Sequence, residues 1–192
     1  MQREKEHQYL EMGIGLYKKG VNMKISDLSF LKIKLKDHPT RDLEMEYIEK
    51  PNAIGVMLLD AKEEKTLLVD QYRPGTNSHL LEIPAGIIED GETALSTLKR
   101  ELREETGYTI DDVELLYSSK EPLASSPGYT TEKLYIYIAK LKDDSVEPLE
   151  LELDLTEDLT TKWVKLEELE EITTDMKTML VYYMYKNKKL NK

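Results

Sequence analysis

Three glutamates in a short charged segment are the residues whose type and spacing most clearly suggest chemistry. Glu101, Glu104 and Glu105 lie at positions i, i+3 and i+4, so a helix would place their carboxylates on one face, with the neighbouring leucines elsewhere. Like charges at this spacing repel one another, and a divalent cation would convert that repulsion into coordination. Mg²⁺ prefers oxygen ligands and often links carboxylates to a substrate phosphate. The pattern favours a metal-dependent phosphate chemistry, and a solvated acidic helix face is the simpler alternative.

The residues around these glutamates narrow the choice. The segment Gly86–Tyr108 reads Gly, five residues, Glu92, seven residues, Arg-Glu-Leu-Arg-Glu-Glu, one residue and Gly107. This spacing reproduces the Nudix box, apart from Tyr108, which stands where an aliphatic residue is usual. The chain therefore resembles the Nudix hydrolases over roughly residues 51–190. The resemblance implies an α/β (α+β) Nudix fold, in which a mixed sheet is sandwiched between helices.

The resemblance also assigns roles to individual residues. It implies hydrolysis of a nucleoside diphosphate linked to a further group, with Mg²⁺ as the cofactor and Mn²⁺ as an alternative. Glu92 would pin the loop before the helix. The implied metal ligands are Glu101, Glu105, Glu104, the carbonyl of Ala85, and Glu157 from an acidic loop near the C-terminus. The implied catalytic residues are Glu104, Arg100, which would hold a glutamate in place, and Glu157, the preferred general base.

Segments outside the box suggest the substrate. Residues 71–75 (QYRPG), 81–86 (LEIPAG) and 126–128 (SPG) are similar to segments of ADP-ribose pyrophosphatases. This similarity implies cleavage of ADP-ribose to AMP and ribose 5-phosphate. It nominates four substrate-binding residues, namely Arg73, Glu82, Gly128 and Glu132. Either Tyr47 or Tyr72 could clamp the adenine. A hydrolase of another nucleoside diphosphate sugar such as GDP-mannose is the alternative, followed by a non-catalytic binding module.

Composition excludes several other classes of protein. The 192 residues include no cysteine, which removes disulfides, zinc–thiolate sites and thiol nucleophiles and fits a cytoplasmic protein. The net charge of −11 argues against general nucleic-acid binding. No segment approaches the ~20 apolar residues that span a bilayer. The charged first residues lack the apolar region of a secretory signal, so we expect no membrane association.

Hydrophobic periodicity predicts the elements that must position these residues. A helix is expected at 92–106, with Leu95, Leu98 and Leu102 facing the core and Gly107 as its C-cap. A second helix is expected at 175–187, after a short helical turn at 166–172. Strands are predicted at 29–36, 43–50, 53–59, 66–72, 79–83, 113–118, 133–139 and 162–165.

The pattern changes near Pro51, which suggests a boundary. Residues 1–50 are predicted to form a small strand-rich N-terminal subdomain, and residues 51–192 the Nudix domain. In the resembling subfamily such N-terminal strands are commonly exchanged between two subunits. Unpaired alternating strands also tend to find a partner. We therefore expect a homodimer.

Overall fold

The chain divides into two compact units. The computed structural model describes residues 16–18, 21–23, 28, 31–153 and 158–190. One unit contains the described part of Met1–Lys50 together with Ser126–Thr131, and the other contains Pro51–Ser125 and Glu132–Lys192. The segment Ser126–Thr131 thus belongs to the N-terminal unit, which the predicted ranges 1–50 and 51–192 did not foresee.

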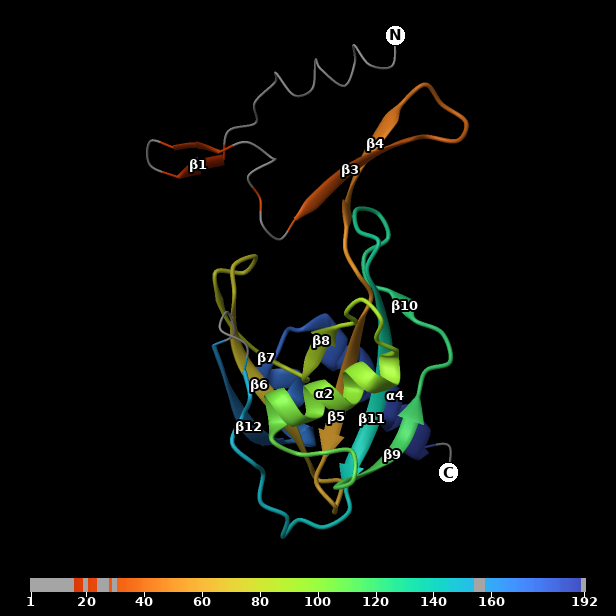
Figure 1. The fold of residues 1–192 in the computed structure, drawn as a ribbon. Helices are drawn as coiled ribbons and strands as arrows, with labels where there is room; N and C mark the ends of the chain where they lie inside the picture. The colour runs from red at the N-terminus through yellow and green to blue at the C-terminus, as the bar shows by residue number, and fades with distance from the viewer. Residues whose placement is uncertain (1–15, 19–20, 24–27, 29–30, 154–157, 191–192) are drawn as a thin grey trace. The chain divides into compact units, whose positions relative to one another are not determined.

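The larger unit is built on an eight-stranded mixed sheet (Figure 1). Its main path follows the order β10-β11-β5-β6-β12, and β7, β8 and β9 pair with β6, β5 and β11 respectively. Of these pairs, β5 and β11 are parallel and the others are antiparallel. The bounds are β5 Ala53–Leu59, β6 Lys65–Arg73, β7 Ser78–Glu82, β8 Ala85–Ile87, β9 Val113–Ser118, β10 Leu123–Ala124, β11 Lys133–Leu141 and β12 Leu159–Lys165.

Helices cover both faces of this sheet. Every residue of β5 is buried, as expected for a central strand with both faces covered. Ile54, Val56 and Leu58 share one core cluster with α2 (Ala94–Thr106). The alternate residues Met57 and Leu59 share a second cluster with α4 (Met176–Leu190). Because successive strand side chains point to opposite faces, the sheet lies between α2 and α4. The predicted mixed sheet between helices is therefore confirmed (Figure 1).

Local signals explain where α2 begins and ends. Thr93 is the N-cap, and its side chain accepts a hydrogen bond from the Ser96 N–H in a capping box. The helix therefore starts two residues after the predicted Glu92. Gly107 ends it in the left-handed conformation, at φ 74°, as predicted. Leu98 and Leu102 are fully buried, whereas Leu95 is 46% exposed and does not join the core, contrary to the prediction.

Other elements differ from the predicted bounds by a few residues. Strand β12 starts at Leu159, three residues before the predicted position, because the whole segment pairs with β6. A 3-10 turn, Leu166–Glu168, and α3, Leu169–Ile172, precede α4. The short strands β8 and β10 were not predicted. No helix among the described residues is long and apolar enough to cross a membrane.

The N-terminal unit contains two small antiparallel sheets. Strands β1 (Leu16–Lys18) and β2 (Val21–Met23) form one sheet, and β3 (Lys32–Asp37) and β4 (Glu44–Glu49) form the other. The segment Ser126–Thr131 attaches to β4 through Ile48, whose N–H donates to the carbonyl of Tyr129 at 2.7 Å. Both β3 and β4 leave large apolar side chains exposed. These are Ile33, Leu35 and Met45, with exposures of 40, 47 and 46%.

Candidate active site

Helix α2 turns two of its three glutamates toward the interior. Glu101 is 4% exposed and Glu105 is 3% exposed, beside the buried Leu98 and Leu102. The side chain of Glu104 is 26% exposed. The prediction that the carboxylates lie on a face apart from the leucines is therefore wrong for Glu101 and Glu105. Residues four apart stack on one helix face, so these glutamates and leucines share it.

The guanidinium group of Arg100 gathers three carboxylates around itself. Its Nη1 donates to Glu101 Oε1 at 2.6 Å and to Glu104 Oε2 at 3.0 Å. Its Nε and Nη2 each donate to one oxygen of Glu92 at 3.0 Å. Nη2 also donates to the carbonyl of Ile87 at 2.9 Å. Arg100 thus links the loop before α2 to the two acidic positions that follow it on the helix.

Glu92 fixes the loop that leads into α2. Its carboxylate accepts hydrogen bonds from the Glu89 N–H at 3.1 Å and from Thr97 Oγ1 at 2.8 Å, in addition to Arg100. The hydrogen bond from Arg100 is the largest of the effects that lower the pKa of Glu92 to about 2. The pKa of Arg100 is raised in turn, chiefly by Glu92. Both groups are therefore charged at neutral pH.

The backbone of Ala85 and Gly86 lies directly against the buried glutamates. The Ala85 N–H donates to Glu105 Oε2 at 2.9 Å. A Cβ atom added to Gly86 would lie 1.6 Å from Glu101 Oε1, so any side chain at this position would require the Glu101 carboxylate to move. Pairing of Ala85 and Gly86 with β5 holds this backbone in place. The start of β8 and helix α2 therefore form one close-packed acidic centre.

The oxygen donors of this centre suit a hard divalent cation. Two buried carboxylates four residues apart, beside the backbone carbonyls of Ala85 and Gly86 in β8, offer the ligands that Mg²⁺ and Mn²⁺ prefer. Among the described residues, however, no three His, Cys, Asp or Glu side chains are arranged to hold a metal ion. Arg100 Nη1 lies between Glu101 and Glu104, so a metal would compete with Arg100 for these oxygens.

A second charged cluster surrounds Glu82, whose side chain is 2% exposed. Arg73 binds this carboxylate with two parallel bonds, Nε to Oε1 at 2.6 Å and Nη2 to Oε2 at 2.9 Å. Lys177 from α4 also donates to Glu82 Oε2, and it pairs with Asp175 at 3.1 Å. Burial alone would raise the pKa of Glu82, but Arg73 and Lys177 outweigh it and lower that pKa. Glu105 contributes to the raised pKa of Arg73, although Glu82 dominates it.

The remaining predicted residues are more scattered. Glu132 lies at the base of a loop, where its Oε2 accepts a hydrogen bond from Ser125 Oγ at 3.0 Å. Gly128 belongs to the N-terminal unit. There it lines a pocket of about 300 Å³ together with Tyr47 and Thr131. Tyr72, the other candidate adenine clamp, is 48% exposed. Glu157 lies outside the described residues.

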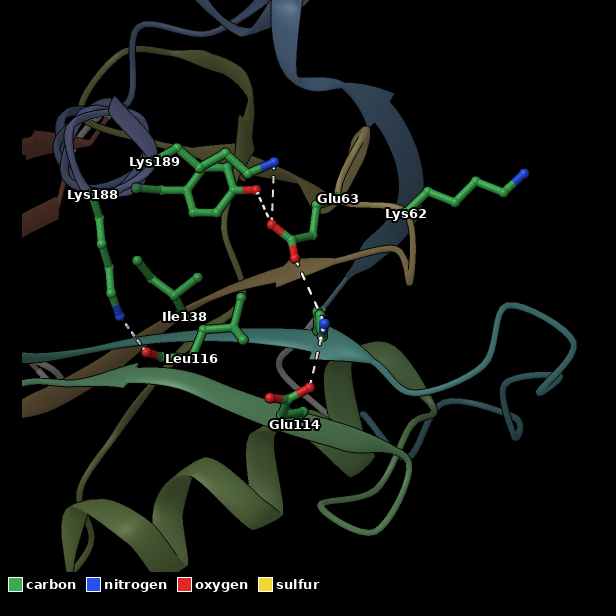
Figure 2. A pocket seen from close by; sticks show the side chains of 9 residues that line it. Lys62, Glu63, Glu114, Leu116, Ile138, Lys188 and Lys189 are labelled. Carbon is green, nitrogen blue, oxygen red and sulfur yellow. Dashed lines mark hydrogen bonds and ion pairs between the residues drawn. The ribbon is translucent and has the colours of Figure 1, made fainter. Parts of the chain in front are cut away.

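A larger pocket of about 430 Å³ opens on the α4 side of the sheet (Figure 2). Lys140 pairs with Glu63 at 3.6 Å and with Glu114 at 3.3 Å. Lys189 and the Tyr185 hydroxyl also bind Glu63, at 3.2 and 2.6 Å. None of the predicted site residues lines this pocket. Its charged side chains tie α4 to the sheet, so we place the active site at α2 instead.

Sequence reasoning missed two residues that support the site. Lys177 comes from the C-terminal helix and carries no spacing signal, because its contact with Glu82 joins positions 95 residues apart. Arg103, within the box, binds the carbonyl of Glu150 at 2.8 Å and the carboxylate of Glu152 at 2.6 Å. It thereby fastens the segment before the acidic loop to α2.

Comparison with known proteins identifies the family that this chain resembles. The family model for the NUDIX domain matches residues 49–183. A methanol dehydrogenase activator from Bacillus methanolicus is 37% identical over 120 residues, covering 57% of this chain and 62% of that protein. An ADP-ribose pyrophosphatase from Bacillus subtilis (strain 168) is 33% identical over 113 residues, covering 59% of this chain and 56% of the relative. The match thus spans little more than half the length of these curated relatives.

A solved structure shows the same fold. The crystal structure of an ADP compounds hydrolase superposes with a TM-score of 0.58 at 21% identity, covering 83% of this chain and 94% of that one. On the strength of the family model, the chain belongs to the Nudix family.

Proposed function

We propose that this protein is a Mg²⁺-dependent hydrolase that cleaves the pyrophosphate bond of ADP-ribose to give AMP and ribose 5-phosphate. The observation that carries the proposal is the pair of buried carboxylates, Glu101 and Glu105, against the backbone of Ala85 and Gly86. Burying two anions costs free energy unless cations or hydrogen bonds offset it. A divalent cation bound to both carboxylates would offset this cost, so the arrangement is suited to metal-assisted chemistry.

The proposed metal ligands are those that the resemblance to Nudix hydrolases implies. Glu101, Glu105, Glu104, the Ala85 carbonyl and Glu157 would hold Mg²⁺, or Mn²⁺ in its place. Bound metal would polarise the pyrophosphate oxygens and lower the pKa of the attacking water. Arg100 would keep the carboxylate that is not coordinating in position, since its Nη1 already reaches two of them. Glu157 is our choice of general base, with Glu104 as a further catalytic group.

Arg73 is the proposed contact for the substrate diphosphate. Arg73 uses Nε and Nη2 on Glu82, which leaves Nη1 for a diphosphate oxygen. Tyr47 and Gly128 share a pocket whose size suits part of a nucleotide, and we assign the adenine to them. Glu132 is proposed for the terminal ribose. The name of the Bacillus subtilis relative supports ADP-ribose as the substrate.

Two further properties belong to the same proposal. The exposed apolar side chains of β3 and β4 support a homodimer formed through the N-terminal unit, because an isolated two-stranded sheet is marginally stable in water. The absence of cysteine in the sequence supports a cytoplasmic location.

Product analysis over two substrates tests the proposal. With Mg²⁺ present, ADP-ribose should yield AMP and ribose 5-phosphate, and it should turn over faster than GDP-mannose. Glu105→Gln should lose at least ~10²-fold in kcat while keeping substrate binding, since a lost electrostatic stabiliser typically costs that much. The exposed Glu167→Gln is the matched control and should retain full activity. Equal rates on both substrates would contradict the assignment of ADP-ribose as the preferred substrate. Full activity of the Glu105→Gln variant would contradict the proposed mechanism.

A further inference from the structure

Hydrogen bonds and an ion pair join the end of β7 to the start of α4 and to the residues just before that helix. Three consecutive residues, 81–83, are each bonded to the segment 173–178, which lies some 90 positions later in the chain. Such contacts fix both backbone and side chain of the strand that leads into β8. The bonds run from Thr173 Oγ1 to the Leu81 carbonyl (2.5 Å), from Lys177 Nζ to the Glu82 carboxylate, and from the Ile83 N–H to Thr178 Oγ1 (2.8 Å).

Lys177 is the charged residue among those that bond to residues 81–83. Its side chain is 14% exposed, between Glu82 at 2% and Asp175 at 14%. Two cations thus bind the buried Glu82: Arg73 donates to both of its oxygens, and Lys177 donates to Oε2. A buried carboxylate that lost one of its partners would be strongly unfavourable, because desolvation would no longer be offset. Lys177 therefore shares with Arg73 the task of neutralising Glu82.

This sharing determines what Arg73 can offer to a ligand. The Arg73 side chain is 41% exposed and meets Glu82 through Nε and Nη2 alone. Its Nη1 points its donors away from that pair, as the planar guanidinium requires. If Lys177 were removed, Glu82 would keep Arg73 as its remaining cation and hold it more tightly. The guanidinium would then be less available to an external anion.

We propose that Lys177 is a positioning residue, which acts through Glu82 to present Arg73 to the diphosphate of the substrate. This inference rests on the proposed function and assigns a role to the C-terminal helix, outside the Nudix box. The contacts of Lys177 are with Glu82 and Asp175, neither of which is a proposed metal ligand. Its effect should therefore fall on substrate affinity rather than on the chemical step.

Steady-state kinetics with ADP-ribose measure this effect. Lys177→Met should raise KM about tenfold and change kcat by less than about threefold. A tenfold rise in KM corresponds to ~1.4 kcal/mol of binding free energy, which is comparable with the loss of one charge-assisted contact. Lys177→Arg should restore KM to within about threefold of wild type, because the positive charge is kept. Lys186→Met is the matched control, since Lys186 lies on the same helix and pairs with the exposed Glu170. Thermal unfolding confirms that each variant is folded, and Lys177→Gln replaces Lys177→Met if the latter is not.

Calorimetric titration with inorganic pyrophosphate gives a second readout that needs no turnover. Wild type, Lys177→Arg and Lys186→Met should bind pyrophosphate alike, while Lys177→Met and Arg73→Met should bind it about tenfold more weakly. A wild-type protein that binds pyrophosphate but hydrolyses neither ADP-ribose nor GDP-mannose would refute the proposed function. In that case the titration alone would test whether Lys177 positions Arg73 for anion binding. Equal affinity in wild type and Lys177→Met, no measurable wild-type binding, or a kcat loss without a change in KM would overturn the inference.

Discussion

Gly86 shows how the lack of a side chain can position a charge. Its backbone approaches Glu101 so closely that a Cβ would lie 1.6 Å from Oε1. The φ angle of Gly86 is not in the left-handed region, so the requirement for glycine here is one of space. The first glycine of the box and its first helical glutamate are therefore a matched pair. A larger residue in place of Gly86 would displace the Glu101 carboxylate from its present position.

Replacing Gly86 by alanine should displace the Glu101 carboxylate. We expect a destabilisation of about 1–3 kcal/mol from overpacking, together with a loss of most activity. Gly75→Ala is the control, because a Cβ there meets nothing within 4 Å. Chemical denaturation and ADP-ribose turnover measure both effects. A Gly86→Ala protein as stable and active as Gly75→Ala would show that Glu101 is not held by this contact.

The Glu92–Arg100 pair should make stability depend on pH in the acid range. The folded-state pKa of Glu92 is about 2, below its ordinary value of 4.5. A depressed pKa contributes stability that is fully present above pH 4.5 and is lost as pH falls toward 2. Glu92→Gln should therefore lower the melting temperature at pH 7, and its difference from wild type should shrink below pH 4.5. A difference that stays constant from pH 7 to pH 2.5 would contradict this assignment.

At the scale of elements, the ends of α2 determine where its charged residues lie. The helix stops at Gly107, whose cap N–H donates to the Arg103 carbonyl. Leu149, which precedes the acidic loop, donates its N–H to the Gly107 carbonyl at 2.9 Å. The C-cap thus joins the helix to the segment that carries Glu152. A change at this cap should disturb the position of that segment.

Two glycines with positive φ separate backbone strain from steric overlap. Gly91→Ala, at φ 89° with open space around it, should cost about 1–2 kcal/mol from the left-handed conformation alone. Gly107→Ala, at φ 74°, should cost more, because its Cβ would also lie 2.2 Å from the Leu149 carbonyl oxygen. Free energies of unfolding from urea titrations test the order. Equal losses in the free energy of unfolding for the two variants would indicate that the backbone at Leu149 moves aside freely.

Elements with long apolar patterns were predictable, and short or contact-dependent features were not. The spacing of Leu98, Leu102 and the box located α2, and a continuous apolar, β-prone run located β5. Thr93 was read as helical, although its hydroxyl caps the helix from outside. Strands β8 and β10 have three and two residues, too few to show a period. The contacts of Arg100 and Lys177 depend on tertiary packing, which residue spacing alone does not encode.

At the scale of the whole molecule, the N-terminal unit bears on the oligomeric state. Leu35 and Met45 expose nearly half of their side chains on a sheet of two strands. Light scattering at micromolar concentration should give about twice the chain mass of 22.3 kDa. Leu35→Lys should shift this mass toward the monomer, whereas Leu115→Lys, at 40% exposure on β9, should not. A wild-type monomer, or equal behaviour of the two variants, would refute the dimer.

The acidic composition of the molecule would give a bound metal ion a second role, the attraction of the substrate. With a net charge of −11, the chain repels an anionic diphosphate at long range. Arg73, Lys177 and Arg100 supply positive charge near the buried glutamates, but each is already paired with a carboxylate. Divalent ions on Glu101 and Glu105 would therefore provide most of the charge that draws the substrate in.

A crystal structure with Mn²⁺ and a non-hydrolysable ADP-ribose analogue tests the central claim most directly. We predict anomalous density for at least one Mn²⁺ within about 2.0–2.3 Å of carboxylate oxygens of Glu101 and Glu105, a range typical of such oxygen ligation. The same ion should contact the diphosphate of the analogue. Well-ordered analogue with no anomalous peak near these two glutamates would contradict the account.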